Sequence, residues 1–429
     1  MSTSMYNASS KFKEFYDDHV VLSAAEQTNL REKKNLNIER LESGLTEYNT
    51  DNNSDYKLTN HKVQGSMAMS TIVQNEENEY DIDVAIIFNK DDLPGGTTAA
   101  KNIIVDALKR KCKRFKTEPE AKTNCVRIEY ASGYHIDFAV YRKSEDEDGN
   151  NVYEHCGSEW RNRDPEVITN WFNKSNKDNN GNVRIVVRLL KMFCKSKSGW
   201  SMPGGLIQSV LVEECIESKD RIDETFYYTI TKIRDRLEEN KEVYNPTNNE
   251  TSLLFNAKDH QKVKNLYTRL KSYISKLDVL FKTVCTEKEA LNAWKEFFNH
   301  NYWGELITES AENRTILSKR MYGNYSVTIV AMVEWHPGQY IPLNEVLGPI
   351  PKGKSIRFTA KPNIFDFSRI EWEVRNNGDE CVELDDLGHV SEGVSVTENT
   401  AYRGGHRMIC RVYRNGSVVC ENEVRIQIK

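Results

Sequence analysis

Three aspartates in this chain lie inside runs of apolar residues, where a carboxylate is costly to bury. Asp81 and Asp83 occur in YDIDVAIIF, and Asp137 occurs in HIDFAVY. Such carboxylates must either reach solvent or meet positive charge. Residues two apart in a strand point to the same face, so Asp81 and Asp83 are expected together, with Asp137 beside them if its strand is a neighbour. Three clustered carboxylates favour hard divalent cations such as Mg²⁺, which prefer oxygen ligands.

A short segment upstream has the composition of a phosphate-binding turn. Gly65 and Ser66 follow a short strand candidate, HKVQ, and precede a predicted helix, MAMSTIV. Glycine lets a backbone approach a ligand closely, and serine is a favourable N-cap residue. The free N–H groups at a helix N-terminus bind phosphate. The order of phosphate-binding turn, paired acids and third acid is what two-metal phosphoryl transfer needs, with one ion holding the triphosphate and the other activating the attacking hydroxyl.

Each of these features also has a simpler interpretation. A lone Gly-Ser pair is common in turns, a D-x-D pair is often an exposed acidic patch, and an isolated strand aspartate usually faces water. The combination favours the metal-site interpretation, because all three acids occur within apolar runs and in the order that the chemistry requires.

The elements predicted around these residues form an α+β lobe. Apolar residues recur at helical spacing through residues 10–46, which predicts long amphipathic helices. The run RFKTEPEAKTNCVRIEY is interpreted as a solvated connection, and the acidic run SEDEDGNN is expected to close the lobe. The remaining predictions for this lobe are strands at 81–88, 124–130 and 134–142 and a helix at 98–111.

From about residue 164 the hydrophobic period becomes helical, and after about residue 322 short strand-like runs follow. These runs predict an all-β sandwich, with Trp335 and Trp372 in its core and a hairpin turn at Asn415-Gly416. The junction is predicted in ENRTILSKRMYGN, and the domains at 1–160, 161–320 and 321–429. Helices are predicted near 165–175, 182–195, 205–217, 222–239, 258–284 and 287–299, with a loop at 245–252.

Composition narrows the class of protein. A formal net charge of −5 over 429 residues argues against a general nucleic-acid binder. The nine cysteines form no C-x-x-C pair and indicate reduced core thiols. The first twenty residues lack the apolar core of a secretion signal, and no run approaches the roughly 18 apolar residues of a membrane span. We therefore expect a cytoplasmic protein without a membrane segment.

Together, Gly65-Ser66, Asp81-x-Asp83 and Asp137 resemble the nucleotidyltransferase fold of DNA polymerase beta, poly(A) polymerases and oligoadenylate synthases. Within that fold, the chain is similar to the bacterial cyclic GMP-AMP synthase-like enzymes (CD-NTases). The similarity extends to the N-terminal segment FKEFYDDHVVLSAAEQTNLREKKNLNIERL and the helical segment VRIVVRLLKMFCKSKSGWSMPGGLIQSVLVEE. The terminal β domain resembles the adenylyl/guanylyl-cyclase-associated sensor domain of some of these enzymes. The resemblance implies a polymerase-beta-like core at 1–160, a helical lobe at 161–320 that completes the active-site cleft, and a β-sandwich accessory domain.

The resemblance implies that the three acids bind metal. Asp81 and Asp83 would bind both of two Mg²⁺ ions, for which Mn²⁺ would substitute. Asp137 would complete the catalytic metal site and help to deprotonate the incoming ribose hydroxyl.

The resemblance also implies nucleotide-binding residues. Gly65 and Ser66 would hold the donor triphosphate, and Lys191 in RLLKMF would neutralise phosphate charge, although a solvated helix lysine explains Lys191 equally well. The family often has a serine where this chain has Gly205, so that phosphate contact is either lost or made by backbone or a neighbour such as Ser209.

The implied function is the joining of nucleoside triphosphates, ATP or GTP, into a cyclic di- or trinucleotide with release of pyrophosphate. Such a product would act on a separate effector protein in anti-phage (CBASS) signalling. Two alternatives stay open: transfer of a nucleotide to RNA or protein, and a catalytically weak module that senses nucleotides. Low basicity disfavours a long nucleic acid as substrate, and the three intact acids disfavour a degenerate module. The candidates for stacking the bases are Tyr130, Tyr134 and Tyr141.

Overall fold

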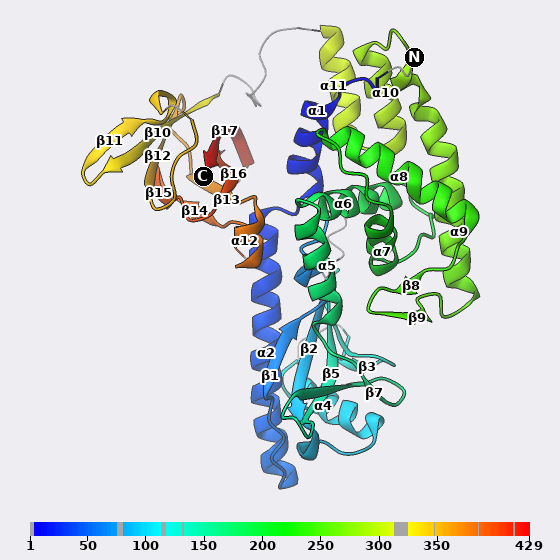
Figure 1. Ribbon diagram of the computed structural model, residues 1–429. Coiled ribbons are helices and arrows are strands. Elements are labelled where there is room, and N and C mark those ends of the chain that lie inside the picture. Colours follow the sequence, from blue (N-terminus) through cyan, green and yellow to red (C-terminus); the bar gives the residue numbers. More distant parts are fainter. Residues whose placement is uncertain are drawn as a thin grey trace. The chain divides into compact units, whose positions relative to one another are not determined.

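The chain divides into two compact units in the computed structural model (Figure 1). The first comprises Met1–Leu22 and Glu32–Glu312, and the second comprises Ser23–Arg31 and Asn313–Lys429. Both lobes predicted for residues 1–320 have most of their residues in the first unit. The structure describes residues 4–74, 80–112, 117–130, 133–312, 325–346, 348–384, 386–414 and 417–429.

The N-terminal region is helical, as the apolar spacing at 10–46 predicts. Helix α1 (Ser9–Phe15) continues into a π-helical turn, Tyr16–Val20, and helix α2 (Ala24–Asn52) follows. Phe12 and Phe15 are fully buried, so the apolar face of α1 belongs to the core.

The predicted acids lie in a seven-stranded mixed sheet. Its order is β1-β2-β5-β4-β3, with β6 beside β5 and β7 beside β6. Strands β2 and β5 are parallel, and the other neighbours are antiparallel. The run SEDEDGNN does not close the lobe but forms the turn between β5 and β6. The strands are β1 (Asn60–Val63), β2 (Asp81–Asn89), β3 (Glu120–Ala121), β4 (Val126–Glu129), β5 (His135–Glu145), β6 (Asn151–Cys156) and β7 (Trp160–Asn162).

Helix α4 (Thr97–Lys111) confirms the helix predicted at 98–111 and packs closely on α2. The closest approach is at Gly44 of α2, where a Cβ atom would lie 1.9 Å from the carbonyl oxygen of Ala107. Only a glycine permits this distance. The contact is reinforced by ion pairs from Arg110 to Asp51 and from Lys111 to Glu47.

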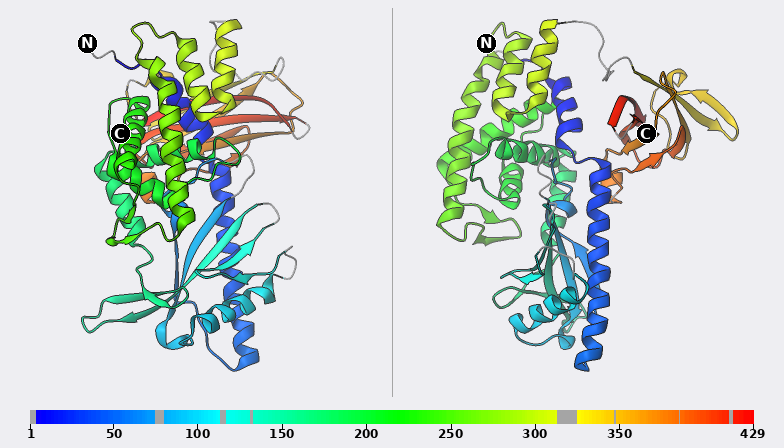
Figure 2. Two further views of the ribbon diagram at one scale, coloured as in Figure 1. Left: turned by 90° about the vertical axis from the view of Figure 1, so that its right-hand side faces the viewer. Right: turned by 180° about the vertical axis from the view of Figure 1, so that it is seen from behind.

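A helical lobe follows the sheet, largely as predicted (Figure 1, Figure 2). The helix predicted at 258–284 ends earlier and continues as a 3₁₀ turn, Ser275–Phe281. The predicted loop at 245–252 is a small hairpin, β8 (Tyr244–Asn245) and β9 (Asn248–Ser252), and α11 was not predicted. The helices are α5 (Val167–Asp178), α6 (Asn182–Lys195), α7 (Gly205–Cys215), α8 (Ile222–Glu239), α9 (Ala257–Ile274), α10 (Glu287–Phe298) and α11 (Asn301–Glu312).

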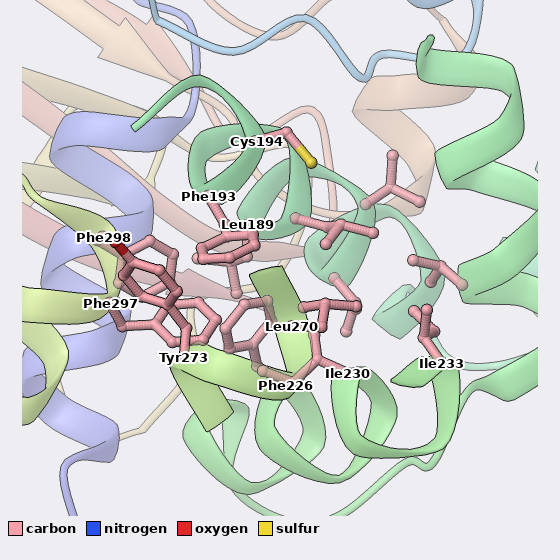
Figure 3. Close-up of a cluster of buried hydrophobic side chains, with 14 of the residues drawn as sticks. Leu189, Phe193, Cys194, Phe226, Ile230, Ile233, Leu270, Tyr273, Phe297 and Phe298 are labelled. Carbon is pink, nitrogen blue, oxygen red and sulfur yellow. The ribbon is translucent and has the colours of Figure 1, made fainter. Parts of the chain in front are cut away.

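The helical lobe has an aromatic core (Figure 3). Phe193 of α6 stacks on Phe297 of α10 with ring centroids 4.4 Å apart, and Phe226 of α8 meets Phe297 edge to face. These three rings are fully buried. Burying one such side chain contributes about 1.5–3 kcal/mol, so this core fixes the position of α6.

The second unit contains the predicted β-sandwich. One sheet has the order β11-β10-β12-β15 and the other β14-β13-β16-β17. Side chains of both sheets share one core, in which Trp372 is fully buried and Trp335 packs at the edge. The strands are β10 (Val327–His336), β11 (Gln339–Pro342), β12 (Ser355–Pro362), β13 (Arg369–Arg375), β14 (Val390–Glu392), β15 (Ser395–Asn399), β16 (Gly404–Arg414) and β17 (Ser417–Ile428), and a short helix, α12 (Asp379–Glu383), follows β13.

Two predictions for the second unit fall outside the described residues. They are the Asn415-Gly416 turn and residues 313–324 of the junction. The strands that flank the turn are antiparallel neighbours, with Arg414 opposite Ser417. Among the helices described in either unit, none carries the long apolar run that crossing a bilayer requires.

The packing of α2 on α4 predicts a severe effect of a small substitution. Gly44→Ala places a methyl group against the Ala107 carbonyl, and overpacking of this kind costs about 1–3 kcal/mol. The matched control is Gly304→Ala in α11, where the new methyl meets only the flexible end of Lys295. Thermal unfolding should show a lower midpoint for Gly44→Ala and an unchanged or higher one for Gly304→Ala. Equal midpoints for the two variants would contradict this account.

Candidate active site

The sheet brings the three predicted acids together. Strands β2 and β5 are parallel neighbours in which Asp83 is opposite Asp137 and Asp81 is opposite His135. In-register residues of adjacent strands point to the same face, and so do Asp81 and Asp83, which are two apart. The neighbouring strands that the convergence requires are therefore present.

The three acids differ in exposure. The Asp81 side chain is 63% exposed and contacts His135, whose Nδ1 lies 3.2 Å from Asp81 Oδ1. The Asp137 side chain is only 14% exposed, and Asp83 is partly buried. Asp81 therefore lies on the solvent-facing side of the cluster, and Asp83 and Asp137 are less accessible to solvent.

Burial and like charge act on Asp83. Desolvation is the main cause that raises the pKa of Asp83, to about 6, and the Asp137 and Asp81 carboxylates raise it further against the opposing effect of Arg127. Asp83 is therefore an acid whose charged form is stabilised by any cation that binds beside it.

A side chain that the sequence analysis did not select, Arg127, neutralises Asp137. Arg127 of β4 is directly opposite Asp137 of β5 and donates from Nε to Oδ1 at 2.8 Å and from Nη2 to Oδ2 at 2.7 Å. The segment RFKTEPEAKTNCVRIEY was predicted to be solvated, and for Arg127 that prediction is wrong. The available signal was the alternation of Val126 and Ile128 around it, which puts Arg127 on the opposite face from those apolar residues, where Asp137 lies.

The carboxylate oxygens of the three acids are the ligands that a hard cation prefers. A bound cation would also offset the negative charge of Asp83, which burial and the neighbouring acids make unfavourable. Both oxygens of Asp137 are engaged by Arg127. Within the described ranges, no three His, Cys, Asp or Glu side chains are gathered closely enough to hold a metal ion. Asp81, Asp83 and Asp137 are the residues that would hold one if their carboxylates turned toward a shared ion.

The turn at Gly65 lies against Asp83. Helix α3 (Gly65–Ala68) is a single turn, and Gly65 has a left-handed backbone with φ of +62°. A Cβ atom at Gly65 would lie 2.1 Å from Asp83 Oδ2, and the Gln64 N–H donates to the Asp83 carbonyl at 2.8 Å. Glycine is therefore required for two reasons, its conformation and its proximity to the acid.

The helix predicted over MAMSTIV is wrong in extent. It begins two residues earlier, with Gln64 rather than Ser66 at the N-cap, and it ends at Ala68. The reason is that Ser70 adopts a left-handed conformation, with φ of +51°, which a helix cannot contain. Ser66 consequently lies inside the first helical turn.

Lys191 lies near this turn but is not solvated. Its ammonium is buried and donates to the Thr71 carbonyl at 2.8 Å and to Thr71 Oγ1 at 2.9 Å. Burial, with help from Lys195 and Arg188, lowers the pKa of Lys191 to about 7, although Asp83 opposes the shift. The interpretation of Lys191 as a solvated helix lysine is therefore wrong.

The missing hydroxyl at Gly205 is not supplied by Ser209. The Ser209 side chain is buried and donates to the Gly205 carbonyl at 2.9 Å within α7. A Cβ atom at Gly205 would lie 3.3 Å from Lys191 Nζ, so glycine leaves space for the ammonium.

The three tyrosines proposed to stack bases have other contacts. Tyr134 and Tyr141 are buried, so both proposals are wrong. The Tyr130 hydroxyl accepts hydrogen bonds from Asn37 at 2.6 Å and Arg40 at 3.2 Å.

Two family models match the chain. Residues 59–141 match the nucleotidyltransferase domain of cyclic GMP-AMP synthase DncV-like proteins, and residues 293–429 match the adenylyl/guanylyl and SMODS C-terminal sensor domain. The first match contains all three acids and the Gly65 turn, and the second contains the β-sandwich.

Relatives and solved structures agree with these matches. A cyclic GMP-AMP synthase of Escherichia albertii is 25% identical over 86% of this chain and 84% of that protein. Vibrio cholerae DncV in complex with a linear pppA(3′,5′)pG intermediate has a TM-score of 0.56 at 18% identity, covering 69% of this chain and 97% of that one. Escherichia coli CdnC with ATP has a TM-score of 0.52 at 15% identity, covering 68% and 98%. These structures share the polymerase-beta-like fold that the sequence predicts.

The repulsion around Asp83 predicts a stabilising substitution. The pKa of Asp83 in the folded protein, about 6, is above its usual value, so this group destabilises the fold progressively as pH rises from about 4 to above 6. Asp83→Asn should raise the free energy of unfolding of the metal-free protein at pH 7.5 by up to about 2 kcal/mol, with no gain near pH 4. Thermal unfolding in EDTA at both pH values measures this. The control, Asp81→Asn at an exposed site, should change little, and an Asp83→Asn protein less stable than wild type at pH 7.5 would refute the prediction.

The Gly65 turn predicts a second stability difference. Gly65→Ala introduces both a left-handed alanine and a contact with Asp83, whereas Gly149→Ala, at φ of +79° with no atom within 4 Å, introduces only the first. The backbone cost common to both is about 1 kcal/mol. Gly65→Ala should lose a further 1–3 kcal/mol or so through overpacking, seen as a lower unfolding midpoint. Equal unfolding midpoints for Gly65→Ala and Gly149→Ala would show that the Gly65 turn accommodates the methyl group without a loss of stability.

Proposed function

Because the chain is a bacterial cyclic GMP-AMP synthase-like nucleotidyltransferase with a C-terminal sensor domain, we propose that it joins ATP, GTP or both into a cyclic di- or trinucleotide. Pyrophosphate is released at each step. The product is a second messenger, made in the cytoplasm, for a separate effector protein in anti-phage defence.

The observation that carries this proposal is the pairing of Asp83 with Asp137 on parallel strands beside the Gly65 turn. In support of the proposal, these acids are near the backbone N–H groups of a helix start, which are suited to a phosphate. Substrate choice follows the relatives, since DncV has been solved with ATP and GTP and Bradyrhizobium diazoefficiens CdnG with GTP.

Each residue has a proposed part in the reaction. The turn at Gly65 and Ser66 holds the donor triphosphate, and the nearby Lys191 offsets phosphate charge. Asp81, Asp83 and Asp137 hold two Mg²⁺ ions, or Mn²⁺ in their place, which when bound activate the attacking hydroxyl and stabilise the pyrophosphate leaving group.

Arg127 also has a part in this proposal. Arg127 orients Asp137 through two N–H donors, and these donors would become available if Asp137 turned toward Asp81 and Asp83. Asp137 then accepts the proton of the ribose hydroxyl. Positioning and charge neutralisation account for the catalysis, as is usual for phosphoryl transfer.

Incubation with each labelled triphosphate, alone and in pairs with Mg²⁺, tests the function. We expect a small product that resists phosphatase, whose linkages nuclease mapping assigns. Label found on RNA or protein would instead support transfer to a macromolecule, and binding without turnover would support a sensing module.

The acids should be essential for this turnover. Asp81→Ala/Asp83→Ala removes the ligands of both ions and should reduce product formation by at least about 100-fold. Asp91→Ala, an exposed acid in the 3₁₀ turn after β2, is the control and should retain activity. Full activity of the double variant, or of wild type in excess EDTA, would exclude the proposed catalysis.

A further inference from the structure

Helix α6 has a basic face in addition to the apolar face that enters the aromatic core. Arg184, Arg188 and Lys191 are spaced by four and three residues and therefore lie along one side of the helix. None is more than 9% exposed. Burying three cations on one helix is costly unless each finds hydrogen-bond partners.

These cations bind the turn that follows α3. Each donates to the carbonyl oxygen of a different residue, and the three residues are consecutive. The bonds are Arg184 Nε to Met69 at 3.1 Å, Arg188 Nε to Ser70 at 2.9 Å and Lys191 Nζ to Thr71 at 2.8 Å.

The N–H groups of the same turn bond back onto α3. The Met69 N–H donates to the Gly65 carbonyl at 3.1 Å, and the Thr71 N–H donates to the Ser66 carbonyl at 2.7 Å. Ser70, between them, has the unfavourable φ of +51°. The turn is thus held in a strained conformation by its bonds to α6 on one side and to Gly65 and Ser66 on the other.

The other end of the turn is fixed to the acid cluster through Gly65, which contacts Asp83. A continuous set of contacts therefore leads from α6 through residues 69–71 and the Gly65-Ser66 turn to Asp83. The position of α6 is itself fixed by Phe193 in the core. The helical lobe thereby sets where the phosphate-binding turn lies relative to the acids.

Arg188 also brings positive charge to the turn. Its second partner is the Tyr16 hydroxyl, at 2.7 Å from Nη1. In the part of the chain that the structure describes, the bonds of Arg188 and Lys191 are to uncharged oxygen atoms. Buried positive charge that is hydrogen-bonded to neutral oxygens raises the local potential and favours a polyanion at the adjacent turn.

We propose that Arg188, assisted by Arg184, is a positioning residue for nucleoside triphosphate binding. It holds Ser70, and through it the Gly65-Ser66 turn, in the conformation that receives the phosphates. This inference rests on the proposed function, because it assigns the residue that prepares the same site. It predicts an effect on substrate binding that exceeds any effect on the chemical step.

The test compares three variants of the full chain. Arg188→Gln removes the charge and the bond to Ser70, Arg188→Lys keeps the charge, and Tyr16→Phe removes only the second partner of Arg188. For each, KM and kcat for ATP and GTP are measured, together with the dissociation constant of α,β-methylene-ATP and hydrogen exchange of the amides at 66–71.

Arg188→Gln should raise KM and the dissociation constant about tenfold, the loss expected for one hydrogen bond from a charged donor, while kcat changes less than about threefold. Arg188→Lys should recover part of the affinity, and Tyr16→Phe should bind as wild type does. Exchange at 66–71 should become faster in Arg188→Gln alone.

Several results would overturn the proposal. One is unchanged affinity in a folded Arg188→Gln protein, and another is an equal loss of affinity in Tyr16→Phe, which would make Arg188 a packing residue. If Arg188→Gln does not fold, Arg184→Gln, which removes the bond to Met69, takes its place, and unchanged affinity with unchanged exchange at 66–71 in that protein would overturn the proposal. Absence of product from the wild type would refute the proposed function separately, since analogue binding and hydrogen exchange do not require turnover.

Discussion

Electrostatic repulsion among three carboxylates is the constraint on which this site depends. The parallel pairing of β2 and β5 puts Asp83 beside Asp137, and the strand period puts Asp81 on the same face. In the absence of other cations, Arg127 relieves the repulsion at Asp137, but Asp83 still has its pKa raised to about 6 by burial and by its neighbours. The fold thus tolerates an unfavourable charge at the position where the proposed reaction needs a cation, a usual relation between stability and function.

The turn at Gly65 and Ser66, which we propose binds phosphate, is positioned mainly by backbone groups. Gly65 approaches Asp83 so closely that no side chain fits between them, and the carbonyls of residues 69–71 accept from the basic face of α6. Backbone atoms have little conformational freedom, so this arrangement preorganises the turn before a ligand arrives. Lys191 contributes to the site in two ways. Its ammonium donates a hydrogen bond to Thr71, and its positive charge lies close to Asp83.

The aromatic core of the helical lobe contributes to the site indirectly (Figure 3). It holds α6 by its apolar face, including Phe193, and so fixes the opposite, basic face that reaches the turn. Core packing is dense and resists displacement, which lets a helix from one lobe define distances in the other. A single helix therefore combines stability with positioning of the site.

The sequence alone determined most of the elements and singled out the three acids. Apolar runs predicted β2 and β5, helical spacing predicted α6, and the carboxylates within the two strand-like runs gave the candidate site residues. These features are local, so they are readable from neighbouring residues. The sequence left open whether β2 and β5 are neighbours, because local patterns do not contain the order of the strands.

Only the tertiary structure decided which charges meet. Arg127 pairs with Asp137 because β4 lies beside β5. Lys191 is buried because α6 lies against the turn at Thr71. The buried tyrosines and the early end of α3 were missed for the same reason. Pairings between residues far apart in the chain depend on strand register and helix packing. The type of a charged residue does not reveal whether its side chain faces water or a partner.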